Sequence, residues 1–306
     1  MNQRRLWAAF VRLFDHVERW AWASVVANSV IIFTGGVVRL TGSGLGCPEW
    51  PRCTEESFVP HSSLGIHGAI EFGNRMLTYV LVVVAIGTFV AVRRWVGTNR
   101  QVRTLATVLA LGIPAQAILG GITVLTGLNP WIVGSHLIVS MALVSGSVLL
   151  LHRVTDRPEG PSTGPAVRLA TLAYLVTWVA VVLGTVVTGS GPHAGDASTE
   201  RNGLDPELWS RIHAVSVWVL VAVTVVLLVS ARRTRLFVPA AVLLGVELAQ
   251  GLIGYVQYFN DLPIALVAAH LVGAAVLMAT ATWVLVRAVD LRKDAPTPHV
   301  TASIRV

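Results

Sequence analysis

Eight long apolar stretches constrain the fold of this chain more than any other feature of its sequence. A helix that crosses a bilayer needs about 20 mostly apolar residues. The stretches cover approximately residues 20–40, 67–92, 103–126, 131–152, 167–189, 208–231, 236–257 and 264–287. A membrane β-barrel would show shorter segments of alternating hydrophobicity instead. The sequence therefore predicts an all-α integral membrane protein with eight transmembrane helices.

Charged residues are scarce, and their distribution predicts the orientation of the helices. They make up 13% of the 306 residues, against about 25% in typical soluble domains. Most of the 23 Lys and Arg residues fall on one side of the predicted spans, the side that holds both termini. The positive-inside rule therefore predicts a multi-pass protein of the plasma membrane with cytoplasmic termini. The net charge of +7 reflects this topology and gives no support for a nucleic-acid partner.

Two sequence patterns occur once in each half of the chain. Residues 41–44 and 188–191 both read Thr-Gly-Ser-Gly, each at the end of an apolar stretch. An aromatic-Val-Leu-Val run also occurs in both halves, and aligning the two runs puts Asn74 opposite His213. Both matches indicate an internal duplication.

A further match is a repeated spacing between glutamine and histidine. Gln116 precedes His136 by 20 residues, and Gln250 precedes His270 by the same interval. Each half holds an even number of spans, so an axis along the membrane normal should relate the halves. We therefore expect two parallel-repeat four-helix bundles. The expected segments are a cytoplasmic N-terminal segment (1–19), an N-terminal half (20–152), a cytoplasmic linker (153–166), a C-terminal half (167–287) and a cytoplasmic tail (288–306).

Four of the nine histidines lie near the outside ends of predicted spans: His67, His136, His213 and His270. An ionisable side chain inside a membrane is costly and is a candidate for function. A single histidine near a helix end is also typical of an interfacial residue. His213 and His270 are expected at one depth, and two imidazoles from facing helices suit the axial positions of a haem iron. Zinc would need further ligands.

Arginines near the same ends are candidates for binding haem propionates, because a carboxylate at a polar edge favours a cationic partner. The candidates are Arg39, Arg75, Arg201 and Arg211. Each of them can also be interpreted as an interfacial residue whose charged head reaches the membrane surface.

Two acidic residues interrupt the predicted spans. Glu71 shares a helical face with His67 and Asn74. Burial would disfavour its charged form, which suits a proton-handling role beside a substrate. The alternative is an ion pair with Arg75 at i+4. For Glu247, the sequence leaves open whether it lines a polar path or makes an interhelical hydrogen bond.

The two cysteines, Cys47 and Cys53, both fall in the first outside loop. So few thiols exclude a disulfide-framework protein and a cysteine-ligated iron–sulfur cluster. The outside of a bacterium is oxidising, which favours a local disulfide. Two unpaired thiols are the alternative.

Residues 34–53 (Thr-Gly-Gly-Val-Val-Arg-Leu-Thr-Gly-Ser-Gly-Leu-Gly-Cys-Pro-Glu-Trp-Pro-Arg-Cys) resemble a signature of the heme A synthase family. Residues 70–75 and 119–126 also resemble that family. The composition, rich in Gly, Ala, Val and Arg, is similar to that of actinobacterial members.

The resemblance implies an oxidoreductase of cytochrome oxidase biogenesis. It would oxidise the C8 methyl group of heme O to a formyl group, by successive hydroxylations and loss of water. In such a protein, His213 and His270 would hold a b-type haem. His136 and the catalytic Glu71 would lie at the heme O site. A Cys47–Cys53 disulfide is also implied.

One position departs from the family pattern, which often has a histidine three residues after the glutamate. Asn74 stands there instead. The substrate iron would then have His136 as its one histidine ligand and an open position, or another group such as His67 would replace the missing ligand.

The same residues are compatible with other functions and with several partners. The alternative functions are a dihaem electron-transfer protein of quinone-reductase type and a parallel-repeat transporter. The partners considered are heme O, membrane lipid, an unidentified electron donor, a heme O synthase and a second copy of the chain.

Overall fold

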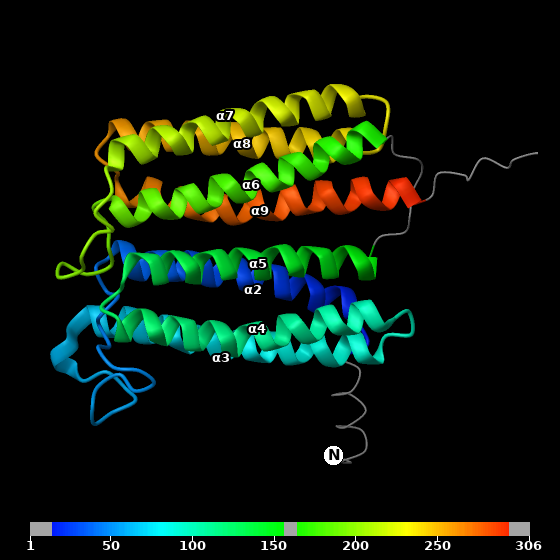
Figure 1. Cartoon of the computed structure of the whole chain (residues 1–306). Helices are drawn as coiled ribbons and strands as arrows, with labels where there is room; N and C mark the ends of the chain where they lie inside the picture. Colours follow the sequence, from blue (N-terminus) through cyan, green and yellow to red (C-terminus); the bar gives the residue numbers. More distant parts are fainter. Residues whose placement is uncertain (1–13, 156–163, 294–306) are drawn as a thin grey trace, which may run out of the picture.

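The computed structural model describes residues 14–155 and 164–293, which form long helices and one short 3-10 helix (Figure 1). Strands are absent from these residues. The N-terminal half contains α2 (Val17–Leu40), η1 (Ser62–Leu64), α3 (Gly65–Arg94), α4 (Arg100–Leu125) and α5 (Pro130–Thr155). The C-terminal half contains α6 (Gly164–Ser190), α7 (Pro206–Ala231), α8 (Phe237–Phe259) and α9 (Ile264–Lys293).

Each of the eight predicted spans corresponds to one long helix. All eight are long and apolar enough to cross a membrane, so the prediction of an all-α multi-pass membrane protein is confirmed. Parts of the expected N-terminal segment, linker and tail, at residues 1–13, 156–163 and 294–306, lie outside the described residues.

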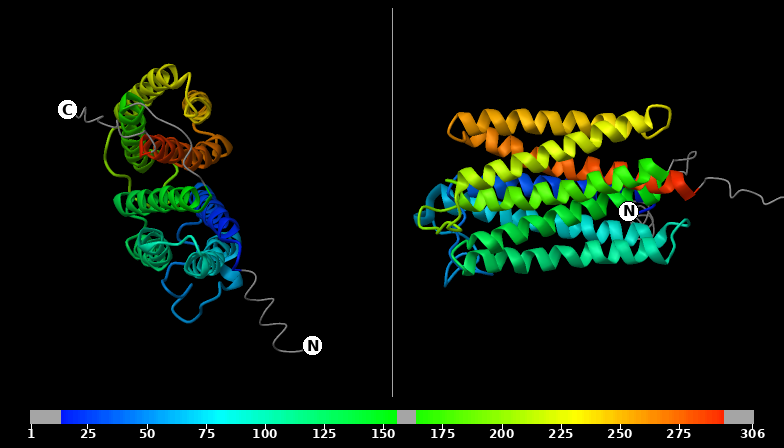
Figure 2. Two further views of the ribbon diagram at one scale, coloured as in Figure 1. Left: turned by 90° about the vertical axis from the view of Figure 1, so that its right-hand side faces the viewer. Right: turned by 45° about the horizontal axis from the view of Figure 1, so that its top comes forward.

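The helices pack as two rings of four. In the first ring, α2, α3, α4 and α5 each contact the next, and α5 contacts α2. In the second ring, α6, α7, α8 and α9 do the same. The view along the helices in Figure 2 shows the two groups side by side. Each ring has its own cluster of buried hydrophobic residues.

The rings meet through α2 and α5 on one side and α6 and α9 on the other. The packed pairs are α2 with α9, α5 with α6, and α5 with α9. This set is unchanged when each helix is exchanged for its counterpart in the other half, which is compatible with the predicted parallel repeat. A hydrogen-bonded chain crosses this interface, because the Ser145 hydroxyl lies 2.9 Å from the Tyr174 hydroxyl and accepts from Thr282 at 2.9 Å. Such bonds hold apolar helices together in a membrane.

The two long connections, residues 41–61 and 191–205, lie at the same end of the bundle, at the left in Figure 1. We call this the loop end. Arg39, at the end of α2, ties the second connection to the first half. Its guanidinium donates to the carbonyl of Thr188 at 2.7 Å and to that of His193 at 2.5 Å. The loop end therefore joins the two halves of the protein.

Candidate functional site

The repeated glutamine–histidine spacing corresponds to a repeated contact near the loop end. The Nε2 of Gln116 in α4 donates to the His136 carbonyl of α5 at 3.0 Å. The Nε2 of Gln250 in α8 donates to the His270 carbonyl of α9 at 3.0 Å. Each histidine lies six residues after the start of its helix, so both are about 9 Å inside the helix end at 1.5 Å per residue. Each half thus fixes one histidine in the same way.

Glycines leave room for these imidazoles. A Cβ atom added at Gly120 in α4 would lie 3.3 Å from Cε1 of His136. A Cβ atom added at Gly254 in α8 would lie 3.5 Å from Cε1 of His270. The bare glycine backbone lets each ring lie close to the neighbouring helix.

His213 in α7 has a similar neighbour. A Cβ atom added at Gly184 in α6 would lie 3.4 Å from its Cε1, and its carbonyl accepts from the Ser216 hydroxyl at 2.6 Å. His213 and His270 both belong to the second ring, and each lies against a glycine of the adjacent helix.

The three histidines share unsatisfied ring nitrogens. The Nδ1 atoms of His136, His213 and His270 are buried and have no hydrogen-bond partner. Buried polar atoms nearly always have partners. A haem iron binds the other ring nitrogen, Nε2, so the imidazoles fit haem ligation without Nδ1 serving as the ligand atom. In the described part of the chain, no three His, Cys, Asp or Glu residues cluster as a metal-ion site would require. This donor set fits haem irons, which need only one or two histidines, better than zinc.

Glu71 is buried and ion-paired. Its side chain contacts Arg75 through Oε1, at 2.5 Å from Nη2 and 3.1 Å from Nε. Its Oε2 accepts from the backbone N–H of Cys47 at 2.6 Å. The ion pair that the sequence left as an alternative is therefore present, together with the expected burial.

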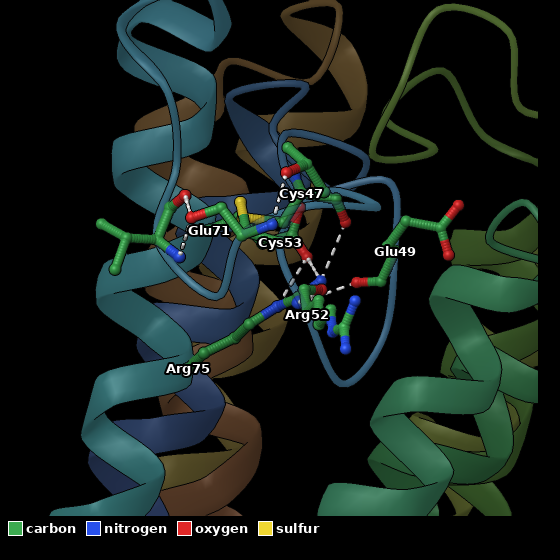
Figure 3. Close-up of a disulfide and its surroundings, with 9 residues drawn as sticks. Cys47, Glu49, Arg52, Cys53, Glu71 and Arg75 are labelled. Atoms are coloured by element: carbon green, nitrogen blue, oxygen red, sulfur yellow. Dashed lines mark hydrogen bonds and ion pairs between the residues drawn. A yellow bond between two sulfur atoms is a disulfide. The ribbon is translucent and has the colours of Figure 1, made fainter.

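Arg75 donates to the backbone of the same loop. It binds the carbonyls of Cys47 at 2.8 Å, Glu49 at 2.9 Å and Arg52 at 2.9 Å (Figure 3). We call Glu71 and Arg75 the loop clamp, because together they fix residues 47–53 to α3. Cys47 and Cys53 are buried and form the predicted disulfide, so the alternative of two free thiols is wrong.

Asn74 and His67, the two residues near the clamp that could provide a second iron ligand, make other contacts. Asn74 accepts a hydrogen bond from the Thr34 hydroxyl at 2.8 Å through its Oδ1. His67 is exposed, and its Nδ1 lies 2.9 Å from the Ser43 hydroxyl. His67 thus contacts Ser43 at the end of the bundle, whereas His136 is half-buried in α5 against Gly120.

The propionate candidates all have partners already. Arg39 and Arg75 bind backbone carbonyls, as described above. Arg201 donates to the carbonyl of Pro192. Arg211 is exposed and pairs with Glu207 one turn earlier in α7. All four lie near the loop end, but Arg39 and Arg75 hold loops in this structure.

Glu247 makes an interhelical hydrogen bond. Its Oε1 accepts from the Thr224 hydroxyl of α7 at 2.7 Å, and its Oε2 is buried without a partner. Of the two interpretations left open by the sequence, the structure shows the bond between α7 and α8.

Trp50 is a neighbour of the site to which the sequence pattern assigned no role. A Cβ atom added at Gly121 in α4 would lie 2.3 Å from Cδ2 of Trp50. The indole therefore rests on the helix next to Gly120, the residue that faces His136. The Gly-Gly pair in α4 was the one sequence feature that indicated a close contact there, but it did not show which residue makes that contact.

Comparisons with known proteins agree on one family. The model of the cytochrome oxidase assembly protein family, COX15-CtaA, matches residues 18–199. A heme A synthase of Listeria welshimeri is 27% identical over 175 residues, which are 55% of this chain and 57% of the relative. Heme A synthases of Geobacillus thermodenitrificans (27% over 147 residues, 47% and 45%) and Lysinibacillus sphaericus (29% over 180 residues, 56% and 58%) are also similar.

The chain spans about half the length of the curated relatives it matches. The family match covers α2 to α6 and ends before α7. His213 and His270 lie beyond it, so their interpretation depends on the internal repeat and on the contacts described above.

Proposed function

Because the chain belongs to the COX15-CtaA family of cytochrome oxidase assembly proteins, we propose that it is a membrane oxidoreductase that converts heme O to heme A. The names of its relatives and the signature at residues 34–53 support this activity. The observation that carries the proposal is the set of three half-buried histidines, one in the first ring and two in the second, each with its imidazole against a glycine of the neighbouring helix.

The second ring would hold a b-type haem through His213 and His270. Gly184 and Gly254 provide close approach for the imidazoles, and Gln250 fixes the backbone of His270. When bound, this haem supplies one-electron transfer. The protein would hold the imidazoles of His213 and His270 on either side of the haem and exclude water from the site.

The first ring would hold heme O, the substrate, through His136. The amide of Asn74 is a poor iron ligand, and Thr34 already binds its oxygen. Asn74 would therefore not ligate the substrate iron, which leaves His136 as its proposed ligand. Glu71 lies on the helix that carries Asn74, one turn earlier. Glu71 would accept a proton as the C8 methyl group is oxidised to a formyl group. The ion pair with Arg75 would keep the Glu71 carboxylate in place.

The positive-inside rule supports cytoplasmic termini in the plasma membrane, with the loop end outside. A heme O synthase in the same membrane would supply the substrate. The conversion of a methyl to a formyl group is a net oxidation, so it also needs an oxidant: dioxygen would supply the oxygen atom of each hydroxylation, and a separate donor would supply the electrons that reduce the second oxygen atom to water. A homo-oligomer would leave these sites within each chain, because both rings are built from one chain.

The alternatives explain less. A dihaem electron-transfer protein of quinone-reductase type would need two histidine pairs, but Asn74 stands where the second histidine would be. A transporter with parallel repeats would show broken helices at matching positions, whereas Pro114 in α4 has no proline counterpart in α8.

The deciding experiment is expression with a heme O synthase, followed by extraction of the bound haems. We expect heme B together with heme A or hydroxylated heme O. Heme B alone would contradict the proposed reaction. A purified protein without a Soret band would contradict both haem interpretations.

A further inference from the structure

We propose that Trp50 is a positioning residue for the substrate haem, and that its indole forms a wall of the first-ring site beside His136. This inference rests on the proposed function. It names a residue outside the ligands and the carboxylate, and it assigns a purpose to the loop clamp.

The clamp fixes the backbone on both sides of Trp50. Arg75 binds the carbonyl of Glu49, just before Trp50, and that of Arg52, two residues after it. Glu71 and Arg75 also bind the N–H and the carbonyl of Cys47. With the disulfide between Cys47 and Cys53 closing the loop, the tryptophan has little freedom to move away from the bundle.

The indole meets α4 at a position that only glycine permits. A Cβ atom added at Gly121 would lie 2.3, 2.5 and 2.7 Å from Cδ2, Cε2 and Cγ of Trp50. The neighbouring Gly120 faces His136. Consecutive residues of an α-helix point about 100° apart, so the indole and the imidazole contact adjacent faces of α4. A flat aromatic ring at this place can pack against the edge or face of a porphyrin.

The second ring lacks this arrangement. The offset that relates Gln116 to Gln250 and His136 to His270 puts Tyr255 opposite Gly121. Tyr255 has its own side chain there, and its hydroxyl accepts from the Trp218 indole at 3.1 Å. A resident haem needs no separable wall, whereas a substrate must enter and a product must leave. A wall formed by a loop can move more easily than one formed by a helix, which suits the first ring, where substrate would enter and product would leave.

The test compares Trp50→Ala, Gly121→Ala and the double variant with wild type, in cells that also express a heme O synthase. Trp131, which is 54% exposed in the first turn of α5, gives the matched control Trp131→Ala. The readouts are heme O retained per b-type haem and the heme O concentration for half-maximal conversion. The Soret spectrum of the b-type haem reports on the second ring.

We expect Trp50→Ala to raise the half-maximal heme O concentration about tenfold, with a smaller fall in the maximal rate, because a packing contact to bound substrate is lost. Gly121→Ala should have a similar effect, since its new methyl group displaces the indole. The double variant should match Trp50→Ala alone, because the methyl group then has nothing to displace. Trp50→Phe should restore most of the affinity, and Trp131→Ala should resemble wild type.

Wild-type substrate retention and half-maximal concentration in Trp50→Ala would overturn the inference, and so would additive effects in the double variant. If Trp50→Ala fails to accumulate, Gly121→Ala and Trp50→Phe carry the same comparison. A wild-type protein that retains heme O but makes no heme A would contradict the proposed function. The retention readout would still decide the role of Trp50.

Discussion

Glu71 makes two kinds of contact through its two carboxylate oxygens. One oxygen contacts the Arg75 guanidinium, and the other accepts from the Cys47 backbone of the disulfide loop. Glu71 therefore anchors the disulfide loop and also places a carboxylate beside the proposed substrate site. Its removal would disturb both functions, so a simple alanine variant would not separate them.

Glutamine at position 71 separates the two functions. Glu71→Gln keeps one carbonyl acceptor and the length of the side chain, so we expect the disulfide loop to stay attached and the b-type haem to stay bound. Conversion of heme O should fall at least about tenfold, since the amide cannot accept a proton. Glu71→Ala should also lower the free energy of unfolding by about 3 kcal/mol, because a buried ion pair loses one partner.

Haem extraction measures the first effect, and thermal unfolding in detergent measures the second. Full conversion in Glu71→Gln would show that the carboxylate has no chemical role and serves the loop alone.

The charged and titratable residues of the candidate site stand out in the sequence, but Trp50 does not. A buried carboxyl or histidine stands out in a charge-poor chain because its burial is costly. Trp50 is one of 10 tryptophans, and nothing in its own sequence neighbourhood shows that its ring would reach Gly121. That contact depends on where the clamp fixes the loop, which is a tertiary property.

Among the elements, the helix ends show what a hydropathy window leaves out. The expected span at 103–126 begins three residues late, because Asn99 caps α4 by accepting from the Val102 N–H at 3.0 Å. The expected span at 208–231 begins two residues late, because Asp205 caps α7 and Pro206 occupies its first turn. Apolar runs mark the part of a helix that lies in hydrocarbon, whereas caps mark the end of its hydrogen bonding. Both signals were present in the sequence.

The connection at residues 191–205 is held by contacts from several directions. Within it, hydrogen bonds from the hydroxyl and the N–H of Ser198 hold the pKa of Asp196 below its ordinary value of 3.8. From the first half, Arg39 binds its His193 carbonyl and the Gly195 carbonyl accepts from the Gly44 N–H at 2.8 Å. This connection is therefore the element through which the two halves are coupled at the loop end.

Arg39→Ala tests this coupling. Hydrogen bonds from a charged group contribute about 1.5–3 kcal/mol each, so we expect faster hydrogen exchange in residues 191–205. The b-type haem should be retained at the wild-type level. Arg211→Ala, at an exposed ion pair of the second ring, is the control and should leave the exchange unchanged. Loss of haem with unchanged exchange would instead support a propionate role for Arg39.

At the scale of the whole molecule, the number of spans followed from hydropathy, but the packing of the two rings did not. Most of these helices are apolar on every side, so the sequence does not mark the faces that meet at the interface of α2 and α5 with α6 and α9. Polar exceptions such as Ser145 and Thr282 are too few to specify a partner. The interface depends on shape and hydrogen bonding, which become visible only in three dimensions.

The histidines proposed for each haem belong to one ring, so the two rings should bind their haems independently. His213→Ala and His270→Ala each remove one proposed ligand from the second ring, and we expect both to lose the b-type haem. His136→Ala should keep that haem and lose retained heme O, because His136 belongs to the other ring. A haem content assay with the Soret spectrum distinguishes these outcomes. Loss of the b-type haem in His136→Ala would show that the two rings bind haem cooperatively. The internal duplication would then account for the architecture, but the two halves would not have separate haem-binding roles.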